Sequence, residues 1–202
     1  MTPTDALFLT PSWTRDDIAY VRDMCNELKL DPAEFFAIPT IESWLNPAYC
    51  VPKDDGKVSS YVAVGLVQFT RIVAVQYKWI LPTEDDKNAY KPWAEFSLKF
   101  HKMTVKEQLP YIKEFLTPFS KKYDIARSYK MYQVFAASSS LEYAKELSDI
   151  IYAEGTPGYE GNKGLDINKE DGGITVNDLR LAIEDAKTRD VYKAIVMRLQ
   201  QL

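Results

Sequence analysis

Histidine and cysteine are scarce in this chain, and their scarcity removes several kinds of chemistry. Among 202 residues there is one histidine, His101, and there are two cysteines. A zinc or iron site built from several imidazoles is therefore excluded, and two cysteines cannot define a disulfide-rich scaffold. Polar chemistry must fall mostly to the 29 carboxylates.

Positive charge and long apolar runs are limited as well. The formal net charge is −4, and no more than two basic residues stand side by side, so the sequence predicts no nucleic-acid partner. The longest apolar stretch, around residues 61–67, is too short to span a membrane. Residues 1–13 lack the basic and apolar regions of a secretory signal, so we expect synthesis in the cytoplasm without a Sec signal peptide.

Helical patterns dominate what the sequence does contain. Thr14 and Asp31 each precede acidic first-turn residues and apolar residues at helical spacing, which predicts two helices that begin there. Four later segments also read as helical. We expect one helix to begin at Thr104 and others to span 128–137, 141–152 and 175–199, the last with a break near 188–190. We expect loops at 46–60, 81–92 and 155–173.

Two prolines and one valine-rich stretch complicate this pattern. Pro39 and Pro110 lie inside helical segments and should kink or end them. Residues 61–69 favour a strand by composition, whereas the continuation to residue 79 favours a helix. The fold expected from the residues is mainly α with little or no β, in a single domain over 1–202.

Two polar residues occupy positions where the pattern calls for apolar ones. Glu42 lies among Ile38, Ile41 and Leu45, and such burial raises the pKa of a carboxyl group. A carboxylic acid that stays protonated near neutral pH is what glycoside cleavage requires. Gln68 ends an apolar stretch, where its amide needs partners that a ligand can supply. The ordinary alternatives are a solvated or paired glutamate and a satisfied core amide.

Taken together, the surroundings of these two residues are similar to a known family. Residues 41–48 read Ile-Glu-Ser-Trp-Leu-Asn-Pro-Ala, and residues 63–69 read Ala-Val-Gly-Leu-Val-Gln-Phe. This pair of motifs resembles the lytic transglycosylase and goose-type lysozyme superfamily. The resemblance implies a lysozyme-like helical bundle around a saccharide cleft, with a catalytic core at about 14–153 and with residues 154–202 packed on it.

The resemblance also implies an activity and a set of site residues. Glu42 matches the catalytic acid that cleaves the β-1,4 bond between N-acetylmuramic acid and N-acetylglucosamine in peptidoglycan. The same glutamate then acts as a base on the sugar's own C6 hydroxyl, giving an anhydro product, or on a water molecule. Ser43 and Gln68 match substrate-binding positions. No metal is implied at this site, and the glycan strands are the expected partner.

Later segments match the family less closely. The usual Ala-Tyr-Asn motif is absent, and the nearest segment, 129–135, offers Tyr132 as the substrate contact. Stretches at 103–109 and 165–175 look like those of phage-encoded members, which implies a virion- or tail-associated protein that acts at the host cell wall. The alternative is a catalytically weak or inactive virion structural or binding protein that contacts other tail proteins.

Two further groups of carboxylates could take part in chemistry. Asp54 and Asp55 lie between the two motifs and could supply a base for water attack, although an Asp-Asp-Gly turn is ordinarily a solvated one. Residues 166–178 approach a calcium loop, with oxygen ligands from Asp166 to Asp178 around a glycine turn. The spacing is one residue too long, so we expect a metal-free loop, with calcium as the alternative.

Overall fold

Side-chain caps set the helix starts that the sequence predicts. In the computed structural model, the Thr14, Thr104 and Thr175 hydroxyls accept backbone N–H groups three residues later, and the acidic residues there reach back in turn. The Asp31 carboxylate accepts from the backbone amides of Ala33 and Glu34 at 2.8 and 3.3 Å. Each cap satisfies amides that a helix start leaves unpaired.

The structure describes residues 12–52, 61–82 and 90–202. Most of these residues are helical, and the expected mainly α fold is confirmed at that level. In chain order the elements are α2 (Arg15–Leu28), α3 (Pro32–Ser43), β1 (Cys50–Pro52), β2 (Tyr61–Val64), β3 (Phe69–Thr70), α4 (Arg71–Gln76), α5 (Tyr90–His101), α6 (Val105–Lys122), α7 (Ser128–Ala137), η1 (Ser138–Glu142), β4 (Ile150–Ala153), α8 (Pro157–Asn162), η2 (Lys163–Leu165), β5 (Gly173–Thr175), α9 (Val176–Thr188) and α10 (Asp190–Leu199).

The two prolines do not end their helices, which was one of the two outcomes expected of them. α3 continues past Pro39 to Ser43, and α6 continues past Pro110 to Lys122. The core buries α3 on most of its surface, so packing holds the helix where its own ladder lacks a bond. Pro110 has no backbone N–H to donate to the Lys106 carbonyl. Both residues are exposed, so water can bond to that carbonyl.

Two small antiparallel sheets, with strands of two to four residues, are the little β that the structure contains, in line with the expectation. β1, β2 and β3 pair in that order, with Cys50 opposite Val64 and Ala63 opposite Thr70, so a strand lies inside the expected loop at 46–60. Residues 61–79 hold both structures that their composition suggested, namely strands followed by α4. β4 pairs with β5.

The helix expected at 141–152 is wrong. η1 ends at Glu142, and β4 begins at Ile150. Between them, the Asp149 carboxylate accepts from the backbone amides of Lys145 and Glu146 at 2.7 and 2.9 Å. A short acidic side chain that bonds local amides in this way stabilises a turn in place of a helix.

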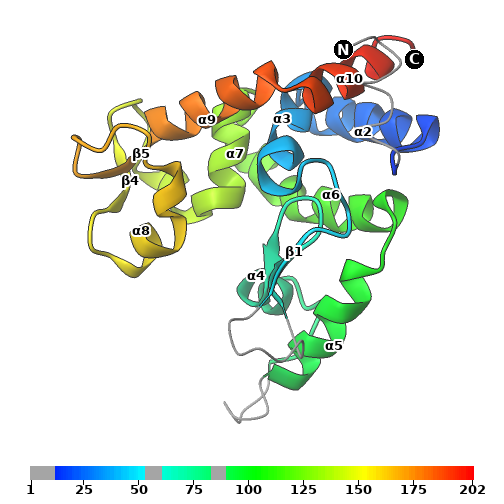
Figure 1. Cartoon of the computed structure of the whole chain (residues 1–202), viewed down its shortest axis with the longest axis horizontal. Helices are drawn as coiled ribbons and strands as arrows, with labels where there is room; N and C mark the ends of the chain where they lie inside the picture. Colours follow the sequence, from blue (N-terminus) through cyan, green and yellow to red (C-terminus); the bar gives the residue numbers. More distant parts are fainter. Residues whose placement is uncertain (1–11, 53–60, 83–89) are drawn as a thin grey trace.

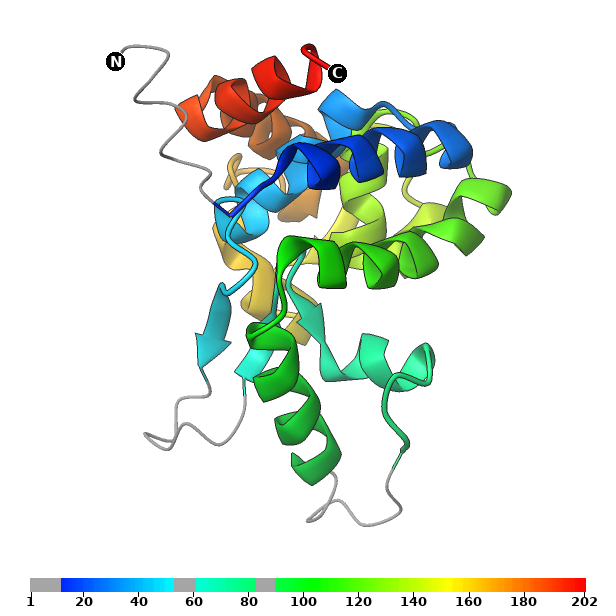
Figure 2. The same ribbon diagram turned by 90° about the vertical axis from the view of Figure 1, so that its right-hand side faces the viewer.

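One continuous core joins the helices, with α3 near its centre. α3 packs against α2, α7, α9 and α10, and the buried core includes residues from Trp13 to Ile195. Figure 1 shows two smaller lobes beside this helical layer, one with β4, β5 and α8 and one with β1, α4 and α5. Seen from the side, α5 and the three-stranded sheet extend below the helices (Figure 2).

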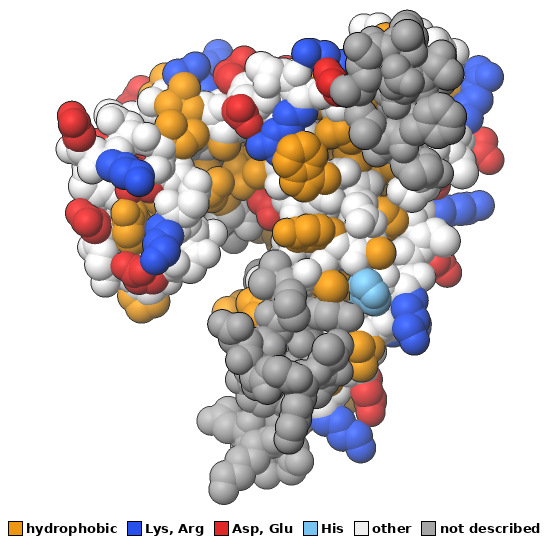
Figure 3. Space-filling view, in the orientation of Figure 1, with side chains coloured by type: hydrophobic (Ala, Val, Ile, Leu, Met, Phe, Trp, Pro, Cys, Tyr) orange, Lys and Arg blue, Asp and Glu red, His pale blue; other side chains and the backbone are white. Residues whose placement is uncertain are grey.

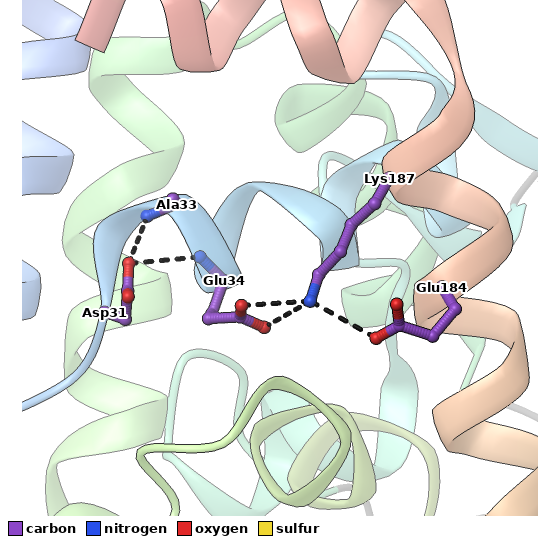
Figure 4. A network of polar contacts seen from close by, with 5 residues as sticks. All are labelled: Asp31, Ala33, Glu34, Glu184 and Lys187. Carbon is purple, nitrogen blue, oxygen red and sulfur yellow. Dashed lines mark hydrogen bonds and ion pairs between the residues drawn. The ribbon is translucent and has the colours of Figure 1, made fainter. Parts of the chain in front are cut away.

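An ion pair fixes the N-terminal end of α3 to α9. Lys187 of α9 bonds both carboxylate oxygens of Glu34 at 2.9 Å and also contacts Glu184 at 3.3 Å (Figure 4). Asp31 caps the same helix end. α3 is therefore tied to α9 at its start, while its last turn carries Glu42.

Candidate active site

A cavity of about 710 Å³ lies where the last turn of α3 meets the sheet β1–β3, helix α7 and the lobe of α8. In the space-filling view the surface is hollowed between the two lobes (Figure 3). The residues that line it are mostly apolar or aromatic, and they are Ile41, Glu42, Tyr49, Val62, Ala63, Val67, Gln68, Thr70, Ile72, Tyr132, Phe135, Ala136, Tyr152, Gly161, Asn162, Gly164 and Leu165. We call it the Glu42 cavity, because Glu42 is the one carboxylate among these lining residues.

Glu42 is half-buried, with its side chain open to the cavity on one side. Burial raises the pKa of its carboxyl to about 7, and a hydrogen bond with Tyr132 acts in the opposite direction. Because the residue stands in the last turn of α3, the helix dipole also disfavours its negative charge. At neutral pH the group is therefore divided between acid and carboxylate, as a general acid and base should be.

Tyr132 comes from α7 and is only 1% exposed. Its hydroxyl is the hydrogen-bond partner of the Glu42 carboxyl, and burial together with that neighbouring carboxylate raises the tyrosine pKa well above its ordinary value. Tyr132 therefore remains protonated and can donate to Glu42 at any pH where the latter titrates. The fold brings these two predicted residues together from separate helices.

Gln68 stands in the turn between β2 and β3, with a positive φ of 53°. Its Nε2 donates to the Gly65 carbonyl at 2.7 Å and to the Tyr49 carbonyl at 3.2 Å. Its Oε1 is buried and has no hydrogen-bond partner among the described residues. A buried acceptor without a donor is unfavourable, so this oxygen would gain from an N–H or O–H donor, and the Gln68 residue that carries it lines the cavity.

The turn that carries Gln68 depends on two residues, of which the sequence analysis missed one. Gly65 has a φ of +81°, and a Cβ there would lie 2.4 Å from the Phe100 ring. Gln108, fully buried on α6, accepts from the Leu66 amide at 2.9 Å and donates to the Pro47 carbonyl at 2.7 Å. An amide in the apolar stripe of α6 was the signal that could have identified Gln108.

Ser43 does not line the cavity, so the expected substrate contact is corrected to a positioning role. Its side chain is fully buried, and its hydroxyl lies 3.0 Å from both the Pro39 and Leu66 carbonyls, between which it shares its one proton. The second of these bonds ties the end of α3 to the β2–β3 turn. Ser43 therefore holds Glu42 and Gln68 in register without reaching a ligand itself.

Of the aromatic residues near the two motifs, Tyr49 lines the cavity and Trp44 does not. Trp44 is 57% exposed and lies under the Arg189 guanidinium, 4.6 Å from the ring centre. Phe135 and Tyr152 are lining aromatics that the sequence analysis did not single out. Asp54 and Asp55, the candidate bases, lie outside the described residues.

A second group of carboxylates lies in the 166–178 loop, among residues that do not line the Glu42 cavity. One carboxylate oxygen from each of Asp166, Asp171 and Asp178 lies within 4.8 Å of the others. The extra residue in the loop therefore does not separate these side chains. Oxygen ligands of this kind suit a hard divalent cation.

Comparisons with models of known protein families, with curated proteins and with solved structures return no match for this chain. Across the described ranges, none of the helices has both the length and the apolar character needed to cross a lipid bilayer. A proposal about function therefore depends on the geometry of the Glu42 cavity and on the motifs around it.

Proposed function

We propose that this chain is a peptidoglycan-cleaving glycosidase, a lysozyme-like muramidase or lytic transglycosylase with Glu42 as its general acid and base. The observation that carries the proposal is a carboxyl group with a pKa of about 7 in the wall of a cavity that Gln68 also lines. The motif resemblance supplies the bond, which is the β-1,4 linkage between N-acetylmuramic acid and N-acetylglucosamine.

In the proposed mechanism, protonated Glu42 donates its proton to the glycosidic oxygen as the bond breaks. The resulting carboxylate then takes a proton from the attacking hydroxyl, which is the sugar's C6 hydroxyl or a water molecule. The Tyr132 hydroxyl orients the carboxyl through both steps. The Gln68 oxygen accepts from an amide or hydroxyl of the sugar, and Tyr49 offers a ring face for stacking.

The proposal extends to where the protein acts. The motifs favour a phage-encoded, virion- or tail-associated protein that opens the host cell wall locally. The second possibility, a non-cleaving structural or binding module of the virion, shares the same cavity. It predicts binding of wall fragments without release of products.

The test compares wild type with Glu42→Gln on purified peptidoglycan. We expect the variant to lose activity by about 10²–10⁴-fold, because the amide cannot donate or accept the proton. Glu95→Gln, at an exposed glutamate on α5, is the matched control and should keep full activity. Equal product release by wild type and Glu42→Gln would exclude Glu42 as the acid.

Mass spectrometry of the released muropeptides then separates the two mechanisms. Attack by the C6 hydroxyl gives anhydro ends that are lighter by one water than the hydrolysed ends. Wall-fragment binding by wild type without any released product would support the non-cleaving module instead.

A further inference from the structure

We propose that the 166–178 loop is a divalent-cation site of the calcium type, built around the carboxylates of Asp166 and Asp171. The inference starts from two oxygen atoms. Oδ1 of Asp166 and Oδ1 of Asp171 are both buried and have no hydrogen-bond partner among the described residues. Asp166 as a whole is 7% exposed. Burying a carboxylate oxygen without a donor or a cation is costly.

The other oxygens of these two residues already have partners. Oδ2 of Asp166 accepts from the Tyr159 hydroxyl at 2.7 Å, and Oδ2 of Asp171 accepts from the Asn168 side-chain amide at 3.3 Å. Since Asn168 donates through its nitrogen, its amide oxygen stays available. The two Oδ1 atoms of Asp166 and Asp171 therefore offer a partial shell, which the Asn168 amide oxygen, backbone carbonyls or water would complete to the six to eight ligands of Ca²⁺.

Asp178 contributes charge to the site and is not one of its ligands. Its two oxygens accept four hydrogen bonds, from the Ile167, Asn168 and Thr175 amides and from the Thr175 hydroxyl. These bonds use up the lone pairs that a metal would need. The three neighbouring carboxylates form no ion pair with a lysine or arginine in the part of the chain that the structure describes.

The loop register decides which acidic residue points inward. With the usual spacing, Glu170 would take the place of the third ligand, yet Glu170 is exposed and Asp171 is the residue within the cluster. The additional residue is thus accommodated on the outside of the loop. Gly172 follows with a φ of +82°, which gives the sharp turn at the place that such loops require.

The site adjoins the wall of the Glu42 cavity. Leu165 lines that cavity, and Asp166 is the next residue in the chain. The Tyr159 hydroxyl links Asp166 to α8, whose Gly161 and Asn162 also line the cavity. A bound cation would therefore fix this wall. Its binding does not depend on the proposed glycosidase activity, and the test below measures no activity.

The experiment uses the full chain after treatment with a chelator. Terbium is added as a probe for calcium, and its luminescence is excited through tyrosine, for which Tyr159 stands next to the site. We expect saturable luminescence that added Ca²⁺ displaces. Asp171→Asn should weaken terbium binding by at least about tenfold, because it removes a charged ligand. Glu170→Gln, in the same loop, is the matched control and should bind as wild type does.

Thermal melting gives a second readout. Without cation, wild type and Asp171→Asn should melt cooperatively with the same circular dichroism. With a dissociation constant of about 0.1 mM, about 10 mM Ca²⁺ should raise the melting temperature of wild type by about 5 °C and that of Asp171→Asn by much less. NaCl at equal ionic strength controls for screening. Luminescence unchanged by Asp171→Asn, or no rise with Ca²⁺, would overturn the proposal.

Discussion

The Glu42 cavity and the 166–178 loop both bury carboxyl groups, but they supply them with very different partners. Asp178 accepts four hydrogen bonds, of which three come from backbone amides. Glu42 has the Tyr132 hydroxyl as its hydrogen-bond partner, and burial raises its pKa to about 7. A buried carboxyl group with many hydrogen-bond donors is held in its charged form and stabilises the fold. One with few donors keeps a raised pKa and can transfer a proton near neutral pH.

Replacing Asp178 by Asn tests the carboxyl group that accepts four hydrogen bonds. The amide nitrogen cannot accept from the Thr175 amide and hydroxyl, so two buried donors lose their partner. We expect the free energy of unfolding to fall by about 3 kcal/mol. Urea denaturation at pH 7 measures it, and an unchanged midpoint would show that the loop rearranges to supply other acceptors.

Replacing Glu42 by Gln also converts a carboxyl group to an amide, but here we expect the free energy of unfolding to rise at high pH. The folded-state pKa is raised, so the wild type loses stability as pH rises from about 4.5 to about 7, while the amide does not titrate. We expect Glu42→Gln to match wild type near pH 4.5 and to exceed it by about 2 kcal/mol at pH 8, after screening through the open side of the cavity. Denaturation curves at both pH values measure this difference, and a variant less stable than wild type at pH 8 would contradict it.

Replacing Tyr132 by Phe sharpens the comparison by removing the hydrogen-bond partner of Glu42. The hydroxyl lowers the pKa of Glu42, so its loss should raise that pKa further. If the chain cleaves peptidoglycan as proposed, the basic limb of its pH–rate profile should move up by about half a unit. Tyr129→Phe, on the same helix, should leave the limb in place. A shift to lower pH would mean that Tyr132 does not favour the charged form.

Replacing Glu184 by Gln tests a largely exposed carboxylate, for comparison with the two buried carboxyl groups. Glu184 contacts Lys187 at 3.3 Å, but more than half of its side chain is exposed. Water screens such a pair, so the free energy of unfolding should change by less than about 0.5 kcal/mol. Thermal denaturation measures it. A change as large as that expected for Asp178→Asn would remove the distinction between buried and exposed carboxylates.

Local signals in the sequence predicted several helix starts, and they singled out the carboxyl group of Glu42. Thr14, Asp31 and Thr175 begin helices because their side chains cap amides only two or three residues away. Glu42 stood out because it interrupts an apolar pattern. Its place in a cavity wall together with Gln68 fits the two motifs, although its catalytic role remains a prediction.

What the sequence could not predict depends on partners that are distant along the chain. Pro39 remains inside α3 because helices from the far end of the chain pack around it. The Gln108 amide holds the β2–β3 turn, and Tyr132 reaches Glu42 only once α7 lies against α3. The inward position of Asp171 follows from how the loop folds and not from its spacing.

The ion pair between Lys187 and Glu34 limits where the chain can be truncated. The helix that carries Glu42 is held at its start by α9 and is packed by α10, so the last segment of the chain forms part of the scaffold of the cavity. A fragment that stops at about residue 153 would leave the buried faces of α3 uncovered. Transplanting the cavity into a chimera therefore requires α9 and α10 to be transferred with it.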